Sequence, residues 1–115
     1  MTRRETREAL AGMSGGEPES IAKAVGLREG SMDLSPLAPT TVALVRIATL
    51  IALDAPPASY GRQVTLALEA GASSEDILAV LRAVAPQVGT ERVIAAAPEL
   101  MLGLGMSLSG DEEDA

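Results

Sequence analysis

Histidine, cysteine, tryptophan, phenylalanine and asparagine are all missing from this chain of 115 residues, and Tyr60 is its only aromatic residue. Without histidine and cysteine the chain cannot build a Ser-His-Asp triad, a Cys/His zinc site or a dithiol redox pair. The absence of cysteine also removes disulfides, so the composition does not indicate a redox compartment. Most thiol, imidazole and zinc chemistry is therefore excluded before any motif is considered.

The charge balance argues against nucleic acid as a partner. The chain has 9 Lys and Arg residues against 16 Asp and Glu residues, a net charge of -7, whereas binding a phosphate backbone needs a basic surface.

No stretch approaches the roughly 18 consecutive apolar residues of a membrane span. Residues 5–8 are Glu-Thr-Arg-Glu, which is polar and mostly charged where a signal peptide would be apolar. We expect a cytoplasmic protein that does not bind nucleic acid or a membrane.

Glycine, proline and serine residues divide the chain into segments with helical periodicity. We expect helices at residues 2–13, 17–27, 39–53, 58–70, 73–86 and 90–104. Gly71 is expected to end the fourth of these helices, Ser73 or Ser74 to cap the fifth and Thr90 to cap the sixth. No segment alternates apolar and polar residues between hairpin turns, so no strands are expected. The prediction is an all-α fold of five to six helices. It comprises an N-terminal helical arm and connector (1–33), a helical domain (34–105) and an acidic flexible tail (106–115).

The segment 39–53 is apolar on almost every side. Such a helix is buried in a core or in a subunit interface, and a short chain has little material to cover it, so we expect self-association. Arg46 interrupts this segment, and a guanidinium there has to be paired, extended to solvent or directed at an anion. Two interpretations stay open: an ion pair with a carboxylate of this or a neighbouring subunit, or recognition of an anionic ligand.

Polar residues gather around the following turn and the first turns of the next helix. They are Asp54, Ser59, Tyr60, Arg62 and Gln63. Beside two consecutive prolines such a cluster can line the mouth of a pocket, where the free N–H groups of a helix N-terminus favour an anion. It can equally be the solvated start of an ordinary helix. Together with Arg46, these residues are the candidate ligand-binding set.

No metal and no cofactor are expected. Gly103, Gly105 and Gly110 lack the spacing and the preceding strand of a dinucleotide-binding loop. The acidic residues near the C-terminus lack the ordered loop that a hard cation requires. Lys23, the only lysine, lies between two alanines on a short polar helix, which is typical of a surface charge rather than a Schiff-base site.

Several stretches carry a resemblance to a known family. The apolar helix at 41–53 is followed by Val-Thr-Leu-Ala-Leu-Glu-Ala-Gly-Ala at 64–72, Ser-Ser-Glu-Asp-Ile-Leu at 73–78 and Ala-Val-Ala-Pro-Gln-Val-Gly at 83–89. From Leu34 to Leu104 the chain resembles the carboxymuconolactone decarboxylase family, also called alkyl hydroperoxidase D-like. The resemblance implies a helical bundle that assembles into dimers, trimers or hexamers, in agreement with the burial expected for the apolar helix.

The residues that give the redox members of this family their activity are absent. Those members have two cysteines separated by two residues, a histidine four residues later and an upstream glutamate. Counted back from Gly71, the cysteine positions correspond to Pro56 and Ser59. The histidine position corresponds to Gln63, and the glutamate position lies near Leu44. Proline, or serine without an adjacent base, cannot attack a peroxide as a thiolate does, so we predict no thiol peroxidase activity.

Three functions therefore stay open. The first is a carboxymuconolactone decarboxylase-like protein that binds a small, anionic or neutral molecule near residues 56–63. The second is a non-catalytic structural or interaction oligomer of the same fold. The third is an active, cofactor-free lactone decarboxylase or isomerase that uses Arg46, Tyr60 and Asp54. An open pocket that contains Arg46 favours the first or third function, whereas an Arg46 ion pair in a subunit interface favours the second.

Overall fold

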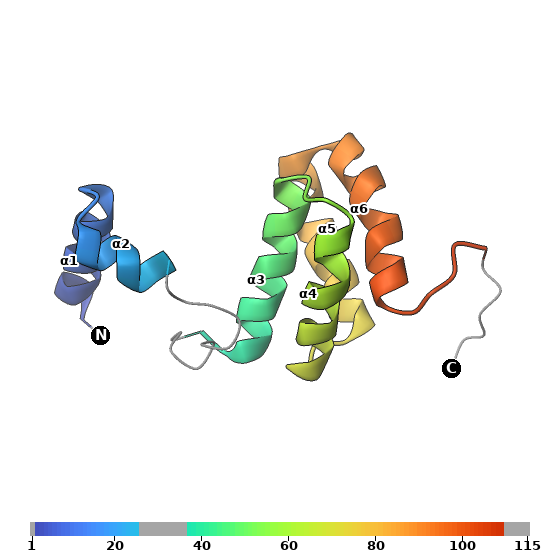
Figure 1. Cartoon of the computed structure of the whole chain (residues 1–115), viewed down its shortest axis with the longest axis horizontal. Helices are drawn as coiled ribbons and strands as arrows, with labels where there is room; N and C mark the ends of the chain where they lie inside the picture. The colour runs from blue at the N-terminus through green and yellow to red at the C-terminus, as the bar shows by residue number, and fades with distance from the viewer. Residues whose placement is uncertain (1, 26–36, 110–115) are drawn as a thin grey trace. The chain divides into compact units, whose positions relative to one another are not determined.

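All regular secondary structure in the described part of the chain is helical. The computed structural model describes residues 2–25 and 37–109, and within these ranges it has six helices and no strand (Figure 1). They are α1 (Arg3–Ser14), α2 (Pro18–Val25), α3 (Pro39–Ala52), α4 (Ala58–Glu69), α5 (Ser74–Val88) and α6 (Thr90–Gly103). The predicted all-α class is confirmed. Most of the predicted acidic tail, residues 110–115, lies outside the described residues.

The chain divides into two compact units, Met1–Pro36 and Leu37–Ala115. The first contains a hairpin of α1 and α2. A capping box begins α1, in which the Thr2 hydroxyl accepts from the backbone N–H of Glu5 and the Glu5 carboxylate accepts from the N–H of Thr2. The two helices approach closely at Gly12, where a Cβ atom would lie 2.5 Å from the hydroxyl oxygen of Ser20. None of the described residues of α1 and α2 is buried.

The second unit is a bundle of four helices. α3 contacts α4 and α5, α6 contacts α4 and α5, and α3 and α6 also touch. α3 and α5 run in one direction, and α4 and α6 run in the other (Figure 1). At one end of the bundle the Thr40 hydroxyl donates a hydrogen bond of 2.6 Å to the Ala70 carbonyl, which ties the start of α3 to the end of α4.

The core of this bundle consists of aliphatic side chains and alanines. Its largest fully buried side chains are Ile47, Ile51, Val64 and Ile77. α6 approaches α4 closely at Gly103, because a Cβ atom there would lie 3.0 Å from the Cβ atom of Val64. A larger residue at position 103 would therefore push these two helices apart.

Within one chain, α3 is buried on only one side. Ala43, Ile47 and Ile51 lie in the core, whereas Val45 is 51% exposed and Leu53 is 72% exposed. At about 100° per residue, Val45 points away from the side that carries Ile47. The chain alone thus leaves part of this apolar helix uncovered, and its burial against a second subunit stays a prediction.

The ends of the last two helices differ in part from the prediction. Ser73 caps α5 as expected, with its hydroxyl accepting from the N–H of Asp76 at 3.0 Å. α5 continues past Pro86 to Val88, because a proline this close to the end removes a single helical hydrogen bond. The predicted cap by Thr90 is wrong: Gly89, with a φ of 89°, occupies that position and offers no side-chain cap.

Candidate functional site

The turn between α3 and α4 positions the first of the predicted site residues. Asp54 has a φ of 51° and is the one described non-glycine residue with a positive φ, a conformation that aspartate tolerates better than most residues. The N–H of Ala55 donates to the carbonyl of Leu50, and the N–H of Ser59 donates to the carbonyl of Pro56. These bonds fix a compact turn that leaves Asp54 exposed and Ser59 half-buried at the start of α4.

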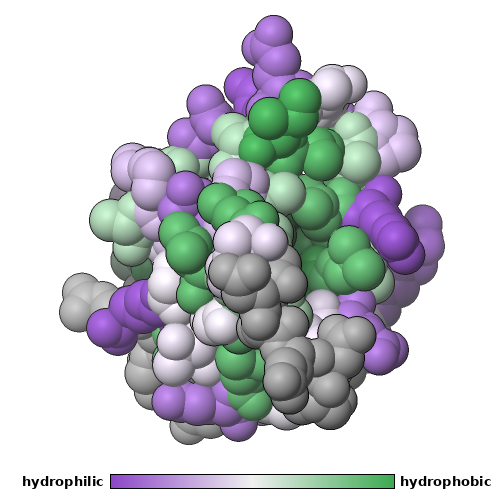
Figure 2. Space-filling view, turned by 90° about the vertical axis from the view of Figure 1, so that its right-hand side faces the viewer, coloured by the Kyte–Doolittle hydropathy of each residue, from purple (hydrophilic) through white to green (hydrophobic). Residues whose placement is uncertain are grey.

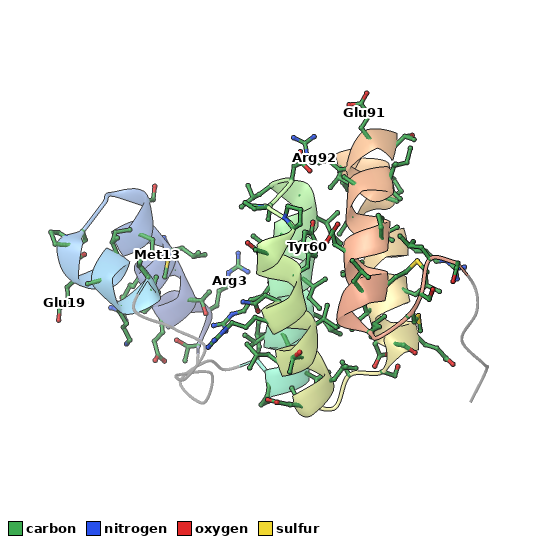
Figure 3. The ribbon with its side chains drawn as sticks, turned by 45° about the vertical axis from the view of Figure 1, so that its right-hand side comes forward. Arg3, Met13, Glu19, Tyr60, Glu91 and Arg92 are labelled. Atoms are coloured by element: carbon green, nitrogen blue, oxygen red, sulfur yellow. The ribbon has the colours of Figure 1, made fainter. Side chains whose placement is uncertain are left out.

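Tyr60 extends from the first turns of α4 into the bundle and is only 3% exposed (Figure 3). Burial raises the pKa of its phenol, and the negative charges of Asp54 and Glu99 raise it further. Tyr60 therefore stays protonated through the neutral range. Its hydroxyl can donate a hydrogen bond to a ligand, but it cannot act as a general base there.

Glu99 is a residue that the sequence analysis missed. It lies on α6, half-buried, one turn before Gly103. Since α4 and α6 run in the same direction and Gly103 packs on Val64, one turn back on each helix places Glu99 beside Tyr60. Nothing local in the sequence connects these two residues, because their proximity depends on how α4 and α6 pack.

Arg46 lies at the level of Gln63 and Val64. The bond between Thr40 and Ala70 sets the register of the antiparallel pair α3–α4. Arg46 lies six residues, or about 9 Å, beyond Thr40 along α3. Six residues back from Ala70 along α4 is Val64, so Arg46 and Val64 lie at the same level of the bundle. Gln63 is half-buried on α4, and its amide oxygen is enclosed by the protein.

The guanidinium of Arg46 is the most unusual polar group in this region. The residue is half-buried, and its Nη1 atom is enclosed and has no hydrogen-bond partner among the described residues. Within those residues the recorded ion pair is Arg4 with Glu8, on the surface of α1. A buried polar nitrogen without a partner is costly, and native structures normally give such a group an ion, a water or a ligand.

The predicted residues are therefore only partly brought together. Tyr60 and Asp54 interact electrostatically, and Arg46 lies level with Gln63, about 6 Å along the helix axis from Tyr60. Arg62 is exposed on α4.

A hollow also lies along α1, lined by Arg3, Arg4, Thr6, Arg7, Leu10, Ala11 and Ser14. Only one helix lines it, so it has no opposite wall to hold a small ligand.

We expect the phenol of Tyr60 to ionise above its ordinary pKa of 10.0 in the folded protein and near that value in the denatured chain. Because folding favours the protonated phenol, its contribution to stability is complete below pH 10.0 and is lost as the pH rises through the raised pKa. The ultraviolet absorbance of tyrosinate measures this directly, since the chain has no other aromatic residue. Glu99→Gln should move the folded titration toward the denatured one, and identical folded and denatured titrations would contradict the burial.

The described residues do not form a metal centre. Within residues 2–25 and 37–109 there is no group of three acidic side chains placed to hold a metal ion. In the same ranges, no helix is both long enough and apolar enough to cross a membrane.

The chain matches the model of a known protein family. The model of the carboxymuconolactone decarboxylase family matches residues 18–100, which include α2 to α5 and most of α6. No curated protein and no solved structure matches the chain.

Proposed function

Because the chain belongs to the carboxymuconolactone decarboxylase family, we propose that it binds a small anionic molecule between Arg46 and the α4 segment near residues 56–63. In this proposal the Arg46 guanidinium is the anion-binding group, and the half-buried amide of Gln63 and the protonated hydroxyl of Tyr60 orient the ligand. The protein performs no thiol peroxidase reaction.

The enclosed Nη1 atom of Arg46 is the observation that carries the proposal. A guanidinium is always charged at neutral pH and presents donors that match a carboxylate or a phosphate. Without a partner among the described residues, this donor has lost its water and gained no protein acceptor. An anionic ligand would supply the missing acceptor and charge, in surroundings where a charged hydrogen bond is stronger than in water.

The residues at the positions that correspond to the cysteines and the histidine of the family's redox members support the proposed absence of thiol peroxidase activity. Pro56 is exposed and Ser59 is half-buried at the start of α4, and neither can form the thiolate that attacks a peroxide. Gln63 occupies the histidine position and cannot take a proton from a neighbouring group. Peroxide reduction would need all of these groups together.

Binding is tested with succinate as the probe anion, at constant ionic strength, by following thermal unfolding with circular dichroism. Succinate should raise the melting temperature of the wild type, because a ligand that binds only the folded state stabilises it. Arg46→Met should abolish the shift. Arg82→Met, which removes an exposed arginine of α5, should keep it. Equal shifts in the wild type and Arg46→Met would place any bound anion elsewhere and refute the proposal.

A structural role as a homo-oligomer is a second candidate function, favoured by the apolar surface of the second unit. Ile94 and Leu102 of α6 are both mostly exposed, as is Leu108 beyond it, and Figure 2 shows apolar side chains gathered on this side of the molecule. Apolar patches rimmed by polar residues are typical of protein–protein contacts. In this alternative a carboxylate of the second subunit pairs with Arg46.

A cofactor-free lyase or isomerase would use the same groups. Tyr60 would donate to the oxygen of an enolate-like intermediate, and Asp54 or Glu99 would serve as the base. Glu99 supplies a half-buried carboxylate that the sequence analysis did not include, and its effect on the Tyr60 pKa indicates that the two side chains are close.

A further inference from the structure

The outer side of α5 and α6 presents apolar side chains that the described residues leave uncovered. Leu78 of α5 is 44% exposed and Ile94 of α6 is 67% exposed. Pro98 and Met101, both half-buried, share the Ile94 side of α6, because residues four and seven positions apart lie on one face of a helix. Figure 2 views the molecule from the side of α6 and shows apolar side chains gathered there. Such a surface is typical of a contact with another protein.

α5 turns the side that carries Leu78 and Arg82 toward α6. The contacts of α4, with α6 at Val64 and with α3 at Ala70, fix the order of the helices around the bundle. In this order, a residue of α5 that directly follows a core residue points to the side that borders α6. Leu78 and Arg82 both follow core residues of α5. Glu75 lies three residues before Leu78, so it shares this side of the helix.

Glu75 and Arg82 place opposite charges at the two ends of this surface. They lie seven residues apart, or about 10 Å along α5, with Leu78 between them. Both are exposed, and neither has an ion-pair partner among the described residues, where the recorded pair is Arg4 with Glu8. We call the side formed by Glu75, Leu78 and Arg82 of α5 and by Ile94, Pro98 and Met101 of α6 the α5–α6 face.

We propose that the α5–α6 face binds the same face of a second copy of this chain, with the two α5 helices antiparallel about a two-fold axis beside Leu78. Because Glu75 and Arg82 lie at similar distances on either side of Leu78, turning one copy end for end places each Arg82 opposite the Glu75 of the other copy. The two-fold axis makes this match occur twice. Met101 lies at nearly the level of Leu78, counted from the turn at Gly89, and comes near the axis as well.

The charges choose the orientation, and the apolar side chains supply the contact. With the two α5 helices parallel, each α5 would lie over the apolar stripe of α6, and Glu75 and Arg82 would gain no partner. Exposed ion pairs contribute little free energy, but they discriminate between arrangements. Arg46 of α3 takes no part in this contact, so the proposal goes beyond the proposed function and does not depend on it. It also differs from an oligomer in which a second subunit pairs with Arg46.

Disulfide cross-linking of the full-length protein tests this proposal, because the chain has no cysteine of its own. Leu78→Cys should form a covalent dimer of twice the chain mass under mild oxidation, since two residues beside a two-fold axis meet the short distance that a disulfide requires. Ala83→Cys is the matched control. Ala83 is also exposed on α5, but it points to the side that borders α3, so this variant should stay at the single-chain mass.

Charge reversal tests the orientation. In the Leu78→Cys background, Glu75→Arg should reduce the covalent dimer, because it brings two arginines together, and adding Arg82→Glu should restore it. Circular dichroism confirms that each variant keeps the wild-type unfolding transition. Absence of a covalent dimer with Leu78→Cys, or equal cross-linking of Leu78→Cys and Ala83→Cys, would overturn the proposed contact. Cross-linking that does not respond to Glu75→Arg would overturn its antiparallel arrangement. The response to succinate plays no part in these readouts, so a failure here is separate from a failure of the anion site.

Discussion

Replacing Ile47 with aspartate is expected to unfold the bundle of α3–α6. Ile47 is fully buried, with an exposed fraction of 0%, on the side of α3 that faces the core. The substitution removes the packing of a large aliphatic side chain, which costs about 2–5 kcal/mol. It also leaves a carboxylate in apolar surroundings at a further cost of several kcal/mol. Together these terms approach the ~5–15 kcal/mol by which a typical domain is stable.

Circular dichroism of the purified protein measures the outcome, with Val45→Asp as the matched control. Val45 is on the same helix but 51% exposed within one chain, so in a single folded chain its aspartate stays in water and should change the unfolding free energy by less than about 1 kcal/mol. A cooperative, wild-type-like unfolding transition for Ile47→Asp would show that this side of α3 is not the core. Loss of helix in both variants would instead indicate that Val45 is also buried, against a second subunit.

Helix positions follow closely from the sequence because local residues determine them. Gly71, with a φ of 101°, follows α4 as a left-handed stop, as its place after the apolar segment predicts. The capping box of Ser73 and Asp76 likewise follows from four consecutive residues, 73–76. Thr90 was predicted wrongly because the preceding Gly89 already supplies the backbone turn, so no side-chain cap is made.

The arrangement of the site could not be predicted in the same way. Arg46 stands out in the sequence because it interrupts apolar residues, but whether its guanidinium meets a carboxylate depends on the faces of the neighbouring helices. The proximity of Tyr60 and Glu99 depends on the close packing of Gly103 against Val64. Such contacts join residues far apart in the chain, where periodicity and capping carry no information.

Arg46→Met is expected to stabilise the free protein, by about 1–2 kcal/mol. The wild-type guanidinium has an enclosed nitrogen with no partner among the described residues, so folding removes water from a charge and returns no hydrogen bond. Methionine has a similar length and no charge to desolvate, and it can fill the space between helices. Denaturation by urea, followed by circular dichroism in the absence of added organic anions, measures the difference.

Two controls separate the charge from the packing. Arg46→Lys keeps a positive charge on a long aliphatic stem and should not stabilise the protein, whereas Arg82→Met, on the exposed side of α5, should change stability by less than about 0.5 kcal/mol. If Arg46 instead pairs with a carboxylate of a second subunit, Arg46→Met leaves that carboxylate unpaired and destabilises the oligomer. The sign of the change therefore distinguishes the binding proposal from the structural one. A charged side chain whose removal stabilises the fold contributes to something other than folding, and residues of this kind are typical of binding sites.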